Sequence, residues 1–536
     1  MSRHRFVGAA AAAAAGFVGL FASPVNVAST LALPPRSASS NPNTPPANPR
    51  RQRFAYVILG SGTTAQAAME TLKAGDPSKE ILIIGPHTVL PRMDGTAIDK
   101  NASLLDARLG KIYNEWRRQL SNSVSWDGDR VSMLRTADVA IDLERRIITT
   151  AAGSSGGGEV EIEYEQCLLA TAGRPREFYV LDSDKLNWGT SDQINILYTP
   201  LDFQNLSRTA AEGGRHITVV GGGYLGTETV CALAESKQCR ITHVLGERAP
   251  LAQYLPRYLS DYVARKLRTS GVDIREETLV TGLVNTNANT PDRGDGGGED
   301  RLKLDLVGKS QTLLETDYLV LASTNVTADL MGLDQSSKTG LEIAMGGIMV
   351  NASLEAYRNF FVAGNAATYF DPNLGRRRVD TYDHAVASGM WAAHNMLNDT
   401  LGKYTHQPTF KSSLAGLGMN LVGIGRIDAK LETVGVWYRH QTSSAVEEDE
   451  TKAPVTATKN AEEEFKRGIV YYLENGRVVG VLLCNAKEMA TRARDVLNAQ
   501  RVLTDPVHDL PKTILLAPSH WLSVISSKPT KLVPQE

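Results

Sequence analysis

The clearest signature of the fold lies in residues 216–237, which read HITVVGGGYLGTETVCALAESK. An apolar run is followed by a glycine-rich turn and a helical stretch, and a second apolar run, ITHVL, follows at 241–245. A continuous apolar run of this length is typical of a strand that is buried on both faces of a parallel sheet. The order of strand, glycine turn, helix and strand predicts a βαβ unit.

The same order of elements occurs earlier in the chain. FAYVIL at 54–59 precedes GSGTTA at 60–65, which is followed by a helical stretch and by the apolar run ILII at 81–84. In such turns the backbone N–H groups at the helix N-terminus approach the pyrophosphate of a dinucleotide. Two copies therefore predict two dinucleotide-binding domains, and the alternative is a pair of tight turns with nothing bound. The residues predicted to bind cofactor in these turns are Gly60, Gly62, Thr63, Thr64, Ala65, Gly221, Gly223 and Gly226.

An acidic residue about 20 residues beyond the glycine turn normally binds the adenosine ribose hydroxyls. Glu247 follows Gly226 at this distance, which favours NAD(H) over NADP(H), although the adjacent Arg248 weakens that preference. The same step from Ala65 reaches Pro86, whose side chain has no hydrogen-bond acceptor. The first copy has therefore lost a standard ribose contact.

Two further strand ends carry small or polar residues. YEQCLLATAG at 164–173 ends with Thr171 and Gly173, and NFFVAGNA at 359–366 contains Asn365. The second turn resembles the place where flavoproteins carry Gly-Asp, whose carboxylate accepts a hydrogen bond from a ribityl hydroxyl. We predict that Thr171, Gly173 and Asn365 bind cofactor, with Asn365 accepting one hydrogen bond through its uncharged amide oxygen.

Composition excludes several classes of protein. The chain has 536 residues, of which 42% are hydrophobic, and its net charge is only −2, which gives no support to a nucleic-acid partner. The basic run 376–378 is interpreted as a solvated loop, with contact to phosphates or nucleic acid as the alternative. The four cysteines form no CxxC pair, which excludes a zinc ribbon, and we predict no metal site.

The first 53 residues predict a leader and a linker. No Asp or Glu precedes Glu70, while Arg, Ser and Ala are frequent, which is typical of an organellar transit peptide. The apolar run at 6–22 leaves a secretory signal or a membrane anchor as the alternative.

The region from residue 409 onward has a different pattern. GIVYYL and RVVGVLLC flank Asn475 and Gly476, which predicts a β-hairpin. An acidic segment at 443–464 predicts disorder, and an amphipathic helix is expected at 488–498.

Together these residues resemble the family of apoptosis-inducing factor, flavoproteins related to pyridine-nucleotide disulfide reductases and ferredoxin reductases. The resemblance spans about residues 54–503. Its most specific segments are CLLATAGRPR (167–176), ITVVGGGYLGTE (217–228), LPRYLSDY (255–262), LGRRRVDTYDHAVASG (374–389), TVGVW (433–437) and FKRGIVYYLENGRVVGVLL (465–483). The last two belong to a C-terminal domain specific to that family.

The resemblance implies an α/β fold with two Rossmann-like domains of the glutathione-reductase type and a C-terminal α+β domain of the dimerisation type. The expected domains are a transit peptide and linker at 1–53, a discontinuous FAD-binding domain at 54–200 and 322–408, an NAD-binding domain at 201–321, and the C-terminal domain at 409–536 with its acidic insertion at 443–464.

The resemblance also implies FAD in the first domain, NADH in the second, and hydride transfer from the nicotinamide to the flavin. Three residues are implied to be catalytic. Tyr224 is the aromatic residue close to the nicotinamide, Glu228 is a carboxylate near the flavin that normally pairs with a lysine, and Asp380 is an acid at the nicotinamide end. His384 is either a donor at the flavin edge or a histidine hydrogen-bonded locally at a helix start.

Departures from the family pattern cluster on the flavin. The positions that differ from the family's flavin contacts are Pro86, Asp94, Asp99 (or Lys100 with a shift of one residue), Tyr198, Thr381, Tyr382, Lys411 and the segment 323–325. Loss of several charge-assisted contacts is expected to weaken FAD binding.

Two hypotheses for function follow. The first is a mitochondrial FAD-dependent NADH oxidoreductase with an unidentified electron acceptor. For this enzyme the resemblance implies a homodimer, an import or assembly partner, a role in respiratory-chain assembly, a place in the intermembrane space or at the inner membrane, and redistribution on apoptosis. The alternative is a flavin-poor or flavin-free relative that binds NAD and acts as a scaffold through its C-terminal domain.

Overall fold

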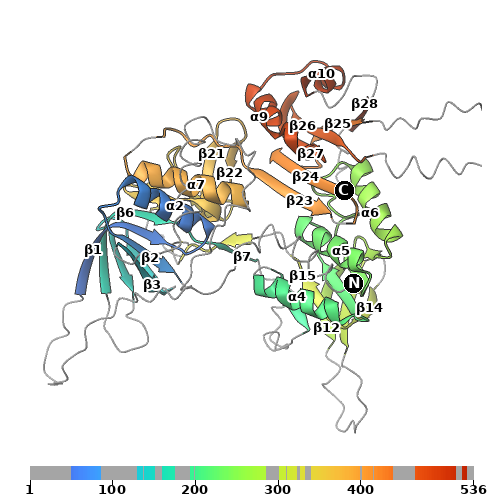
Figure 1. The fold of residues 1–536 in the computed structure, drawn as a ribbon, viewed down its shortest axis with the longest axis horizontal. Coiled ribbons are helices and arrows are strands. Elements are labelled where there is room, and N and C mark those ends of the chain that lie inside the picture. The colour runs from blue at the N-terminus through green and yellow to red at the C-terminus, as the bar shows by residue number, and fades with distance from the viewer. Residues whose placement is uncertain are drawn as a thin grey trace, which may run out of the picture. The chain divides into compact units, whose positions relative to one another are not determined.

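The computed structural model describes residues 50–85, 130–136, 138–150, 160–175, 193–197, 200–284, 301–308, 311–322, 326–331, 333, 340–398, 401–414, 416–438, 465–514 and 522–527. These residues form two compact units (Figure 1). One unit contains the described residues up to Arg174 together with Val326–Pro408. The other contains Pro175–Asn325 and the described residues from Thr409 onward.

The first unit is built on an eight-stranded sheet with a parallel centre, ordered β3-β2-β1-β6-β20. This is the order of a doubly wound fold, in which the strand order reverses between β1 and β6. The parallel strands are β1 (Arg50–Leu59), β2 (Ile81–Gly85), β3 (Val131–Arg135), β6 (Val160–Leu169) and β20 (Phe360–Val362). The remaining strands of this sheet are β4 (Val139–Asp142), β5 (Ile147–Thr150) and β19 (Glu355–Tyr357).

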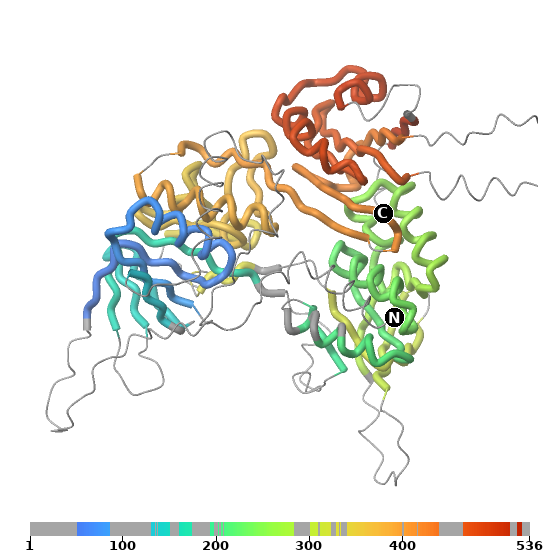
Figure 2. Tube along the Cα trace, in the orientation of Figure 1, coloured from blue at the N-terminus to red at the C-terminus, as the bar shows by residue number. Residues whose placement is uncertain are grey.

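Two helices of the first unit pack against each other beside this sheet. They are α2 (Thr63–Gly75) and α7 (Tyr382–Met396). Figure 2 shows that residues 50–85 and the described residues between 326 and 408 lie side by side in this unit. Strand β20 pairs directly with β6. Smaller strands complete the unit: β7 (Gly173–Pro175), β16 (Val326–Ala328), β17 (Ile343–Ala344), β18 (Gly347–Met349), β21 (Ala367–Asp371) and β22 (Gly375–Arg377).

The second unit begins with another parallel sheet, ordered β11-β10-β9-β15-β8. Its strands are β8 (Ile194–Ile196), β9 (His216–Val220), β10 (Arg240–Val244), β11 (Asp273–Arg275) and β15 (Tyr318–Leu321). Its helices are α4 (Pro200–Glu212), α5 (Tyr224–Ser236) and α6 (Arg257–Thr269). An antiparallel sheet follows, made of β12 (Leu279–Val284), β13 (Leu302–Val307) and β14 (Gln311–Thr316).

Strand β8 lies before the domain boundary expected at residue 200, but it belongs to the second sheet. Leu319 to Leu321 of β15 pair in parallel with Ile194 to Ile196 of β8, so this strand extends the second sheet instead of the first. Hydrogen bonding to β15 therefore moves the start of the second parallel sheet toward the N-terminus.

The C-terminal part of the second unit is a six-stranded antiparallel sheet with helices. The sheet is ordered β23 (Thr409–Leu414), β24 (Met419–Gly425), β27 (Arg477–Cys484), β26 (Gly468–Glu474), β25 (Glu432–Tyr438) and β28 (Leu522–Ser527). The hairpin predicted around Asn475 and Gly476 is confirmed, because β26 pairs with β27 across this turn. The expected helix is α9 (Ala490–Ala499), and it is followed by α10 (Pro506–Thr513).

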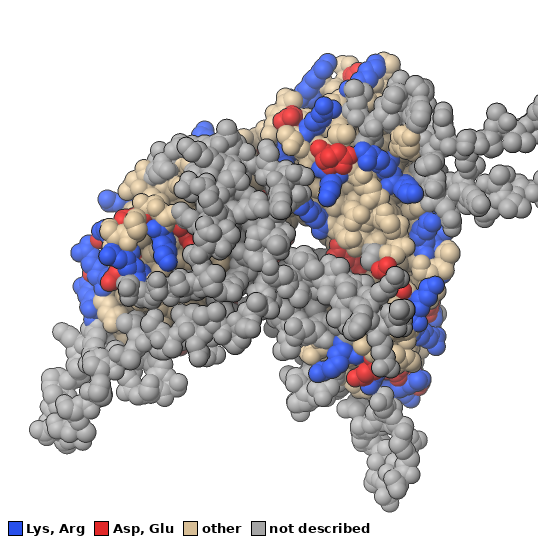
Figure 3. Space-filling model, viewed as in Figure 1, with Lys and Arg blue, Asp and Glu red and all other residues tan. Residues whose placement is uncertain are grey.

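The described surface carries both signs of charge. In the face drawn in Figure 3, Lys and Arg side chains lie among Asp and Glu side chains. Within the described ranges, every helix is too short or too polar to cross a membrane. The expectations for the leader, for Pro86, Asp94, Asp99, Lys100 and Tyr198, and for the segments 323–325 and 443–464 concern residues outside the described part of the chain.

Candidate dinucleotide sites

The first glycine turn joins β1 to α2 at the point where the strand order reverses. Gly60 has φ of +118°, and a Cβ atom there would lie 2.4 Å from the carbonyl oxygen of Ala170. Only glycine fits this backbone conformation and this close approach. Gly62 is the N-cap of α2 and carries no side-chain cap, so the first N–H groups of the helix are left for an anion.

The second glycine turn repeats this geometry between β9 and α5. Gly221 has φ of +129°, and a Cβ atom there would lie 2.3 Å from the carbonyl oxygen of Ala322. A Cβ atom on Gly226 would lie 2.0 Å from the carbonyl oxygen of Gly221, so the helix packs directly on the turn. Gly223, the N-cap of α5, also carries no side-chain cap.

The two turns are equivalent in position as well as in sequence. Ala170 follows β6 and Ala322 follows β15, the strands that neighbour β1 and β9 on the far side of each switch point. Dinucleotides bind at the carboxyl ends of parallel strands at such points. Each unit therefore has the backbone geometry of one dinucleotide-binding turn.

Glu247 lies beside the second turn, three residues beyond the end of β10. A Cβ atom on Gly222 would lie 2.4 Å from Glu247 Oε2, which places the carboxylate directly against the glycine turn. Its other oxygen accepts a hydrogen bond from Gln253 Nε2. Arg248 Nη1 pairs with Asp261 Oδ1, so part of the positive charge that would attract a 2′-phosphate is already neutralised.

Tyr224, the first residue of α5, packs within an aromatic cluster. Its ring centroid lies 4.5 Å from that of Tyr254 and 4.7 Å from that of Phe410 in β23. Burial raises the pKa of its hydroxyl well above the usual value, and this hydroxyl has no hydrogen-bond partner among the described residues. Tyr224 therefore provides an aromatic surface and no acid or base.

Glu228, one turn further along α5, contacts the C-terminal sheet. Its Oε1 accepts a hydrogen bond of 2.8 Å from the backbone N–H of Ser413. Burial raises the pKa of the Glu228 carboxyl, and hydrogen bonds from residues 412 and 413 oppose this effect. The positions to which the family's partner lysine would map, 99 and 100, lie outside the described residues.

In the first unit, the turn Gly364–Ala366 lies beside the start of α2. A Cβ atom on Gly364 would lie 2.2 Å from Thr64 Oγ1. Asn365 Oδ1 accepts a hydrogen bond from Arg378 Nη1. Thr171 Oγ1 donates a hydrogen bond to the carbonyl oxygen of Asp329.

His384 is completely buried near the start of α7. Its Nδ1 lies 2.9 Å from the Tyr404 hydroxyl, and its ring stacks on Tyr369 with a centroid separation of 5.0 Å. Burial, with a smaller contribution from His406, lowers the pKa of His384 to about 3, so the ring is neutral at physiological pH. The His384 ring thus bonds a residue that is distant in sequence, and its Nε2 has no hydrogen-bond partner among the described residues. Asp380 is exposed.

The basic run 376–378 is not a solvated loop, which corrects the interpretation from sequence. Arg376 donates to the carbonyl oxygens of Val350 and Thr368, and Arg377 pairs with the buried carboxylate of Asp371. Sequence analysis missed Arg378 as a residue of the candidate cofactor site. The run of basic residues was the available signal, but its partners are distant in sequence.

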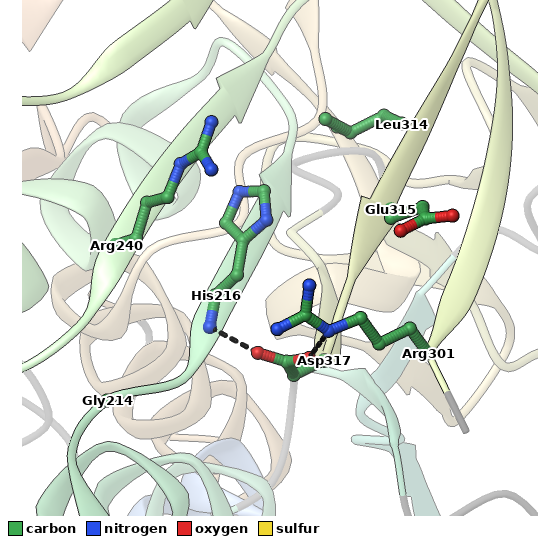
Figure 4. Close-up of a pocket in the computed structure, with 7 residues that line it drawn as sticks. All are labelled: Gly214, His216, Arg240, Arg301, Leu314, Glu315 and Asp317. Atoms are coloured by element: carbon green, nitrogen blue, oxygen red, sulfur yellow. Dashed lines mark hydrogen bonds and ion pairs between the residues drawn. The ribbon is translucent and has the colours of Figure 1, made fainter. Parts of the chain in front are cut away.

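A cavity of about 300 Å³ lies at the other end of the second sheet (Figure 4). It is lined by Gly214, His216, Arg240, Arg301, Leu314, Glu315 and Asp317. Asp317 pairs with Arg301 at 2.8 Å and accepts a 2.7 Å hydrogen bond from the backbone N–H of His216. Because His216 begins β9, this cavity lies at the amino ends of the strands and is not the dinucleotide crevice.

Comparison with known proteins agrees with this geometry. The family described as "Pyridine nucleotide-disulphide oxidoreductase" matches residues 54–389, and the domain described as "Apoptosis-inducing factor, mitochondrion-associated, C-term" matches residues 439–499. The chain therefore belongs to the pyridine nucleotide-disulphide oxidoreductase family.

Within this family the chain is related to apoptosis-inducing factor. It is 30% identical to "Apoptosis-inducing factor 1, mitochondrial" of Dictyostelium discoideum over 474 residues, which cover 85% of this chain and 80% of that protein. It is 28% identical to "Putative apoptosis-inducing factor 1, mitochondrial" of Drosophila melanogaster, with 84% of this chain and 64% of that protein covered.

A solved structure supports the fold. The chain is similar to a chain in the crystal structure of the covalent putidaredoxin reductase–putidaredoxin complex, with a TM-score of 0.60 and 18% identity. The match covers 84% of this chain and 94% of that chain. Membership of this family and the relation to apoptosis-inducing factor make the protein a flavoprotein NADH oxidoreductase whose cofactors are FAD and NAD(H). The resemblance found in the sequence is therefore confirmed.

Proposed function

We propose that the first unit binds FAD at the Gly60–Ala65 turn and that the second binds NADH at the Gly221–Gly226 turn. The observation that carries this proposal is the repeated glycine turn, in which a strand-end glycine and an uncapped helix N-terminus meet at each switch point. Bound FAD supplies the acceptor for the hydride of NADH.

The residues of the chain bind and orient the cofactors. The N-terminal N–H groups of α2 and α5, together with the positive ends of the helix dipoles, hold the two pyrophosphates. Thr171, Gly173 and Asn365 contribute to the FAD site. Catalysis of this kind depends on the relative position of two rings, and we assign Tyr224, Glu228 and Asp380 to that positioning.

The proposed cellular role is that of a mitochondrial oxidoreductase in the intermembrane space or at the inner membrane. The mitochondrial names of the two relatives and the acid-free N-terminal sequence support this location. We further propose a homodimer, a protein partner in import or respiratory-chain assembly, and redistribution on cell death. The C-terminal domain match supports such protein contacts.

The visible spectrum of the purified protein tests the proposed function. We expect the protein to take up FAD and to show a flavin absorbance band that bleaches when NADH is added without oxygen. NADPH is expected to bleach the band less efficiently, because the Glu247 carboxylate repels a 2′-phosphate. A protein that stays colourless after incubation with FAD would instead support the flavin-free scaffold.

Glu247→Ala is expected to weaken NADH binding by about 10- to 100-fold, because the ribose hydroxyls lose a charged acceptor worth about 1.5–3 kcal/mol. Titration of the protein with NADH, followed by fluorescence, measures this effect. Glu315→Ala is the matched control, since Glu315 pairs with Lys303 on β13 and lines the cavity at the opposite strand ends. An unchanged dissociation constant for Glu247→Ala would remove Glu247 from the binding site.

A further inference from the structure

Arg378 contacts the same turn that sequence analysis assigns to FAD. Its Nη1 donates hydrogen bonds to both oxygens of Asn365, the side-chain Oδ1 and the backbone carbonyl oxygen, the latter at 3.3 Å. Its Nε donates a 3.0 Å hydrogen bond to the carbonyl oxygen of Met345. The guanidinium group is therefore fixed from two sides.

The aliphatic part of Arg378 is held as well. A Cβ atom on Gly347 would lie 3.0 Å from Arg378 Cδ, so the arginine side chain passes close to the backbone at the start of β18. Met345 lies in the turn between β17 and β18, which presents its carbonyl oxygen to Nε. Three elements of one unit thus determine where the guanidinium group lies.

This contact fixes the orientation of the Asn365 amide. A guanidinium group has only donors, whereas an amide has one oxygen acceptor and one NH₂ donor group. The oxygen must therefore be turned toward Arg378. The NH₂ group then remains for another partner, and Asn365 Nδ2 forms no hydrogen bond with the described residues.

The amide lies next to the proposed pyrophosphate cradle. Asn365 follows Gly364, which approaches Thr64 at the start of α2. Asn365 is 8% exposed, so a contact with FAD would be made in a largely desolvated place. In such a place, the direction of a hydrogen bond affects affinity strongly.

We propose that Arg378 is a positioning residue that reverses the polarity of the contact between Asn365 and FAD. Asn365 donates a hydrogen bond through Nδ2 to a ribityl hydroxyl oxygen, and its Oδ1 is not available to accept one. This inference rests on the proposed FAD site, and it differs from the expectation that the amide oxygen serves as the acceptor.

Asn365→Asp tests the proposal. One carboxylate oxygen keeps the contact with Arg378, which neutralises the new charge, and the other oxygen becomes an acceptor for the ribityl hydroxyl. We expect FAD to bind about tenfold more tightly, since a charge-assisted hydrogen bond replaces a neutral one. Titration of flavin-free protein by quenching of flavin fluorescence measures the affinity, and circular dichroism checks the fold.

A double-mutant cycle with Arg378→Met separates positioning from general stability. In the Arg378→Met background, Asn365→Asp leaves a carboxylate without its partner. We therefore expect Asn365→Asp to weaken FAD binding in this background instead of strengthening it. Arg376→Met is the matched control, because Arg376 binds the carbonyl oxygens of Val350 and Thr368. This substitution should change FAD affinity neither in the unaltered protein nor in Asn365→Asp.

The outcomes distinguish this inference from the function on which it rests. If the unaltered protein binds FAD but Asn365→Asp binds it equally or more weakly, the reversed contact is wrong. If Asn365→Asp tightens binding equally with and without Arg378, Arg378 has no positioning role. If the unaltered protein does not bind FAD, the proposed function fails first.

Discussion

Gly226→Ala is expected to lower NADH affinity by at least about 100-fold. The added Cβ atom would lie 2.0 Å from the carbonyl oxygen of Gly221 and 3.5 Å from Ala322 Cβ. Because the first of these contacts is with backbone, no side-chain rotation relieves it, and α5 must move away from β9. Its N-terminal donors then leave the position in which we propose that they hold the pyrophosphate. Overpacking of this kind is also expected to cost about 1–3 kcal/mol in the free energy of unfolding.

Gly282→Ala provides the matched control for this substitution. Gly282 lies in β12 of the same unit, and a Cβ atom there would meet no atom within 4 Å. NADH titration and urea denaturation should therefore give this variant nearly the same NADH affinity and free energy of unfolding as the unaltered protein. If Gly226→Ala retained full NADH affinity, the start of α5 would not be the pyrophosphate site.

The glycine turns and the hairpin could be predicted because their determinants are local. Gly60 and Gly221 must adopt positive φ beside a neighbouring strand, and few other residues tolerate that conformation. The position of Glu247 beside the second turn also follows from the lengths of the strand and the helix. The sequence between a strand end and a helix start therefore contains most of the information for this part of the site.

The contact between Arg378 and Asn365 could not be predicted in the same way. It depends on the turn between β17 and β18, which presents the Met345 carbonyl oxygen to the arginine. The pairing of β8 with β15 could not be predicted either, because a segment of three residues does not reveal which sheet it will join. In both cases the deciding partner is distant in sequence.

Acidification from pH 7.5 to pH 5 is expected to destabilise both units, because each contains a completely buried histidine. His384 in the first unit has a pKa of about 3, and His243 in the second has a pKa of about 4. Burial lowers both values from the ordinary 6.5, although the hydrogen bond between His243 Nε2 and the Gly221 carbonyl oxygen, 2.9 Å long, opposes the shift. The unfolded chain therefore takes up protons below about pH 6.5 that the folded chain does not.

The sign of the effect follows from this difference in bound protons. Stability is fully present above about pH 6.5 and is lost as the pH falls toward the folded pKa values. At pH 5 each histidine costs about 2 kcal/mol in the free energy of unfolding, since one pKa unit corresponds to about 1.4 kcal/mol. Urea denaturation at a series of pH values measures the slope of the free energy of unfolding against pH. His384→Gln and His243→Gln should each flatten it. If both variants kept the slope of the unaltered protein, the acid sensitivity would arise elsewhere in the chain.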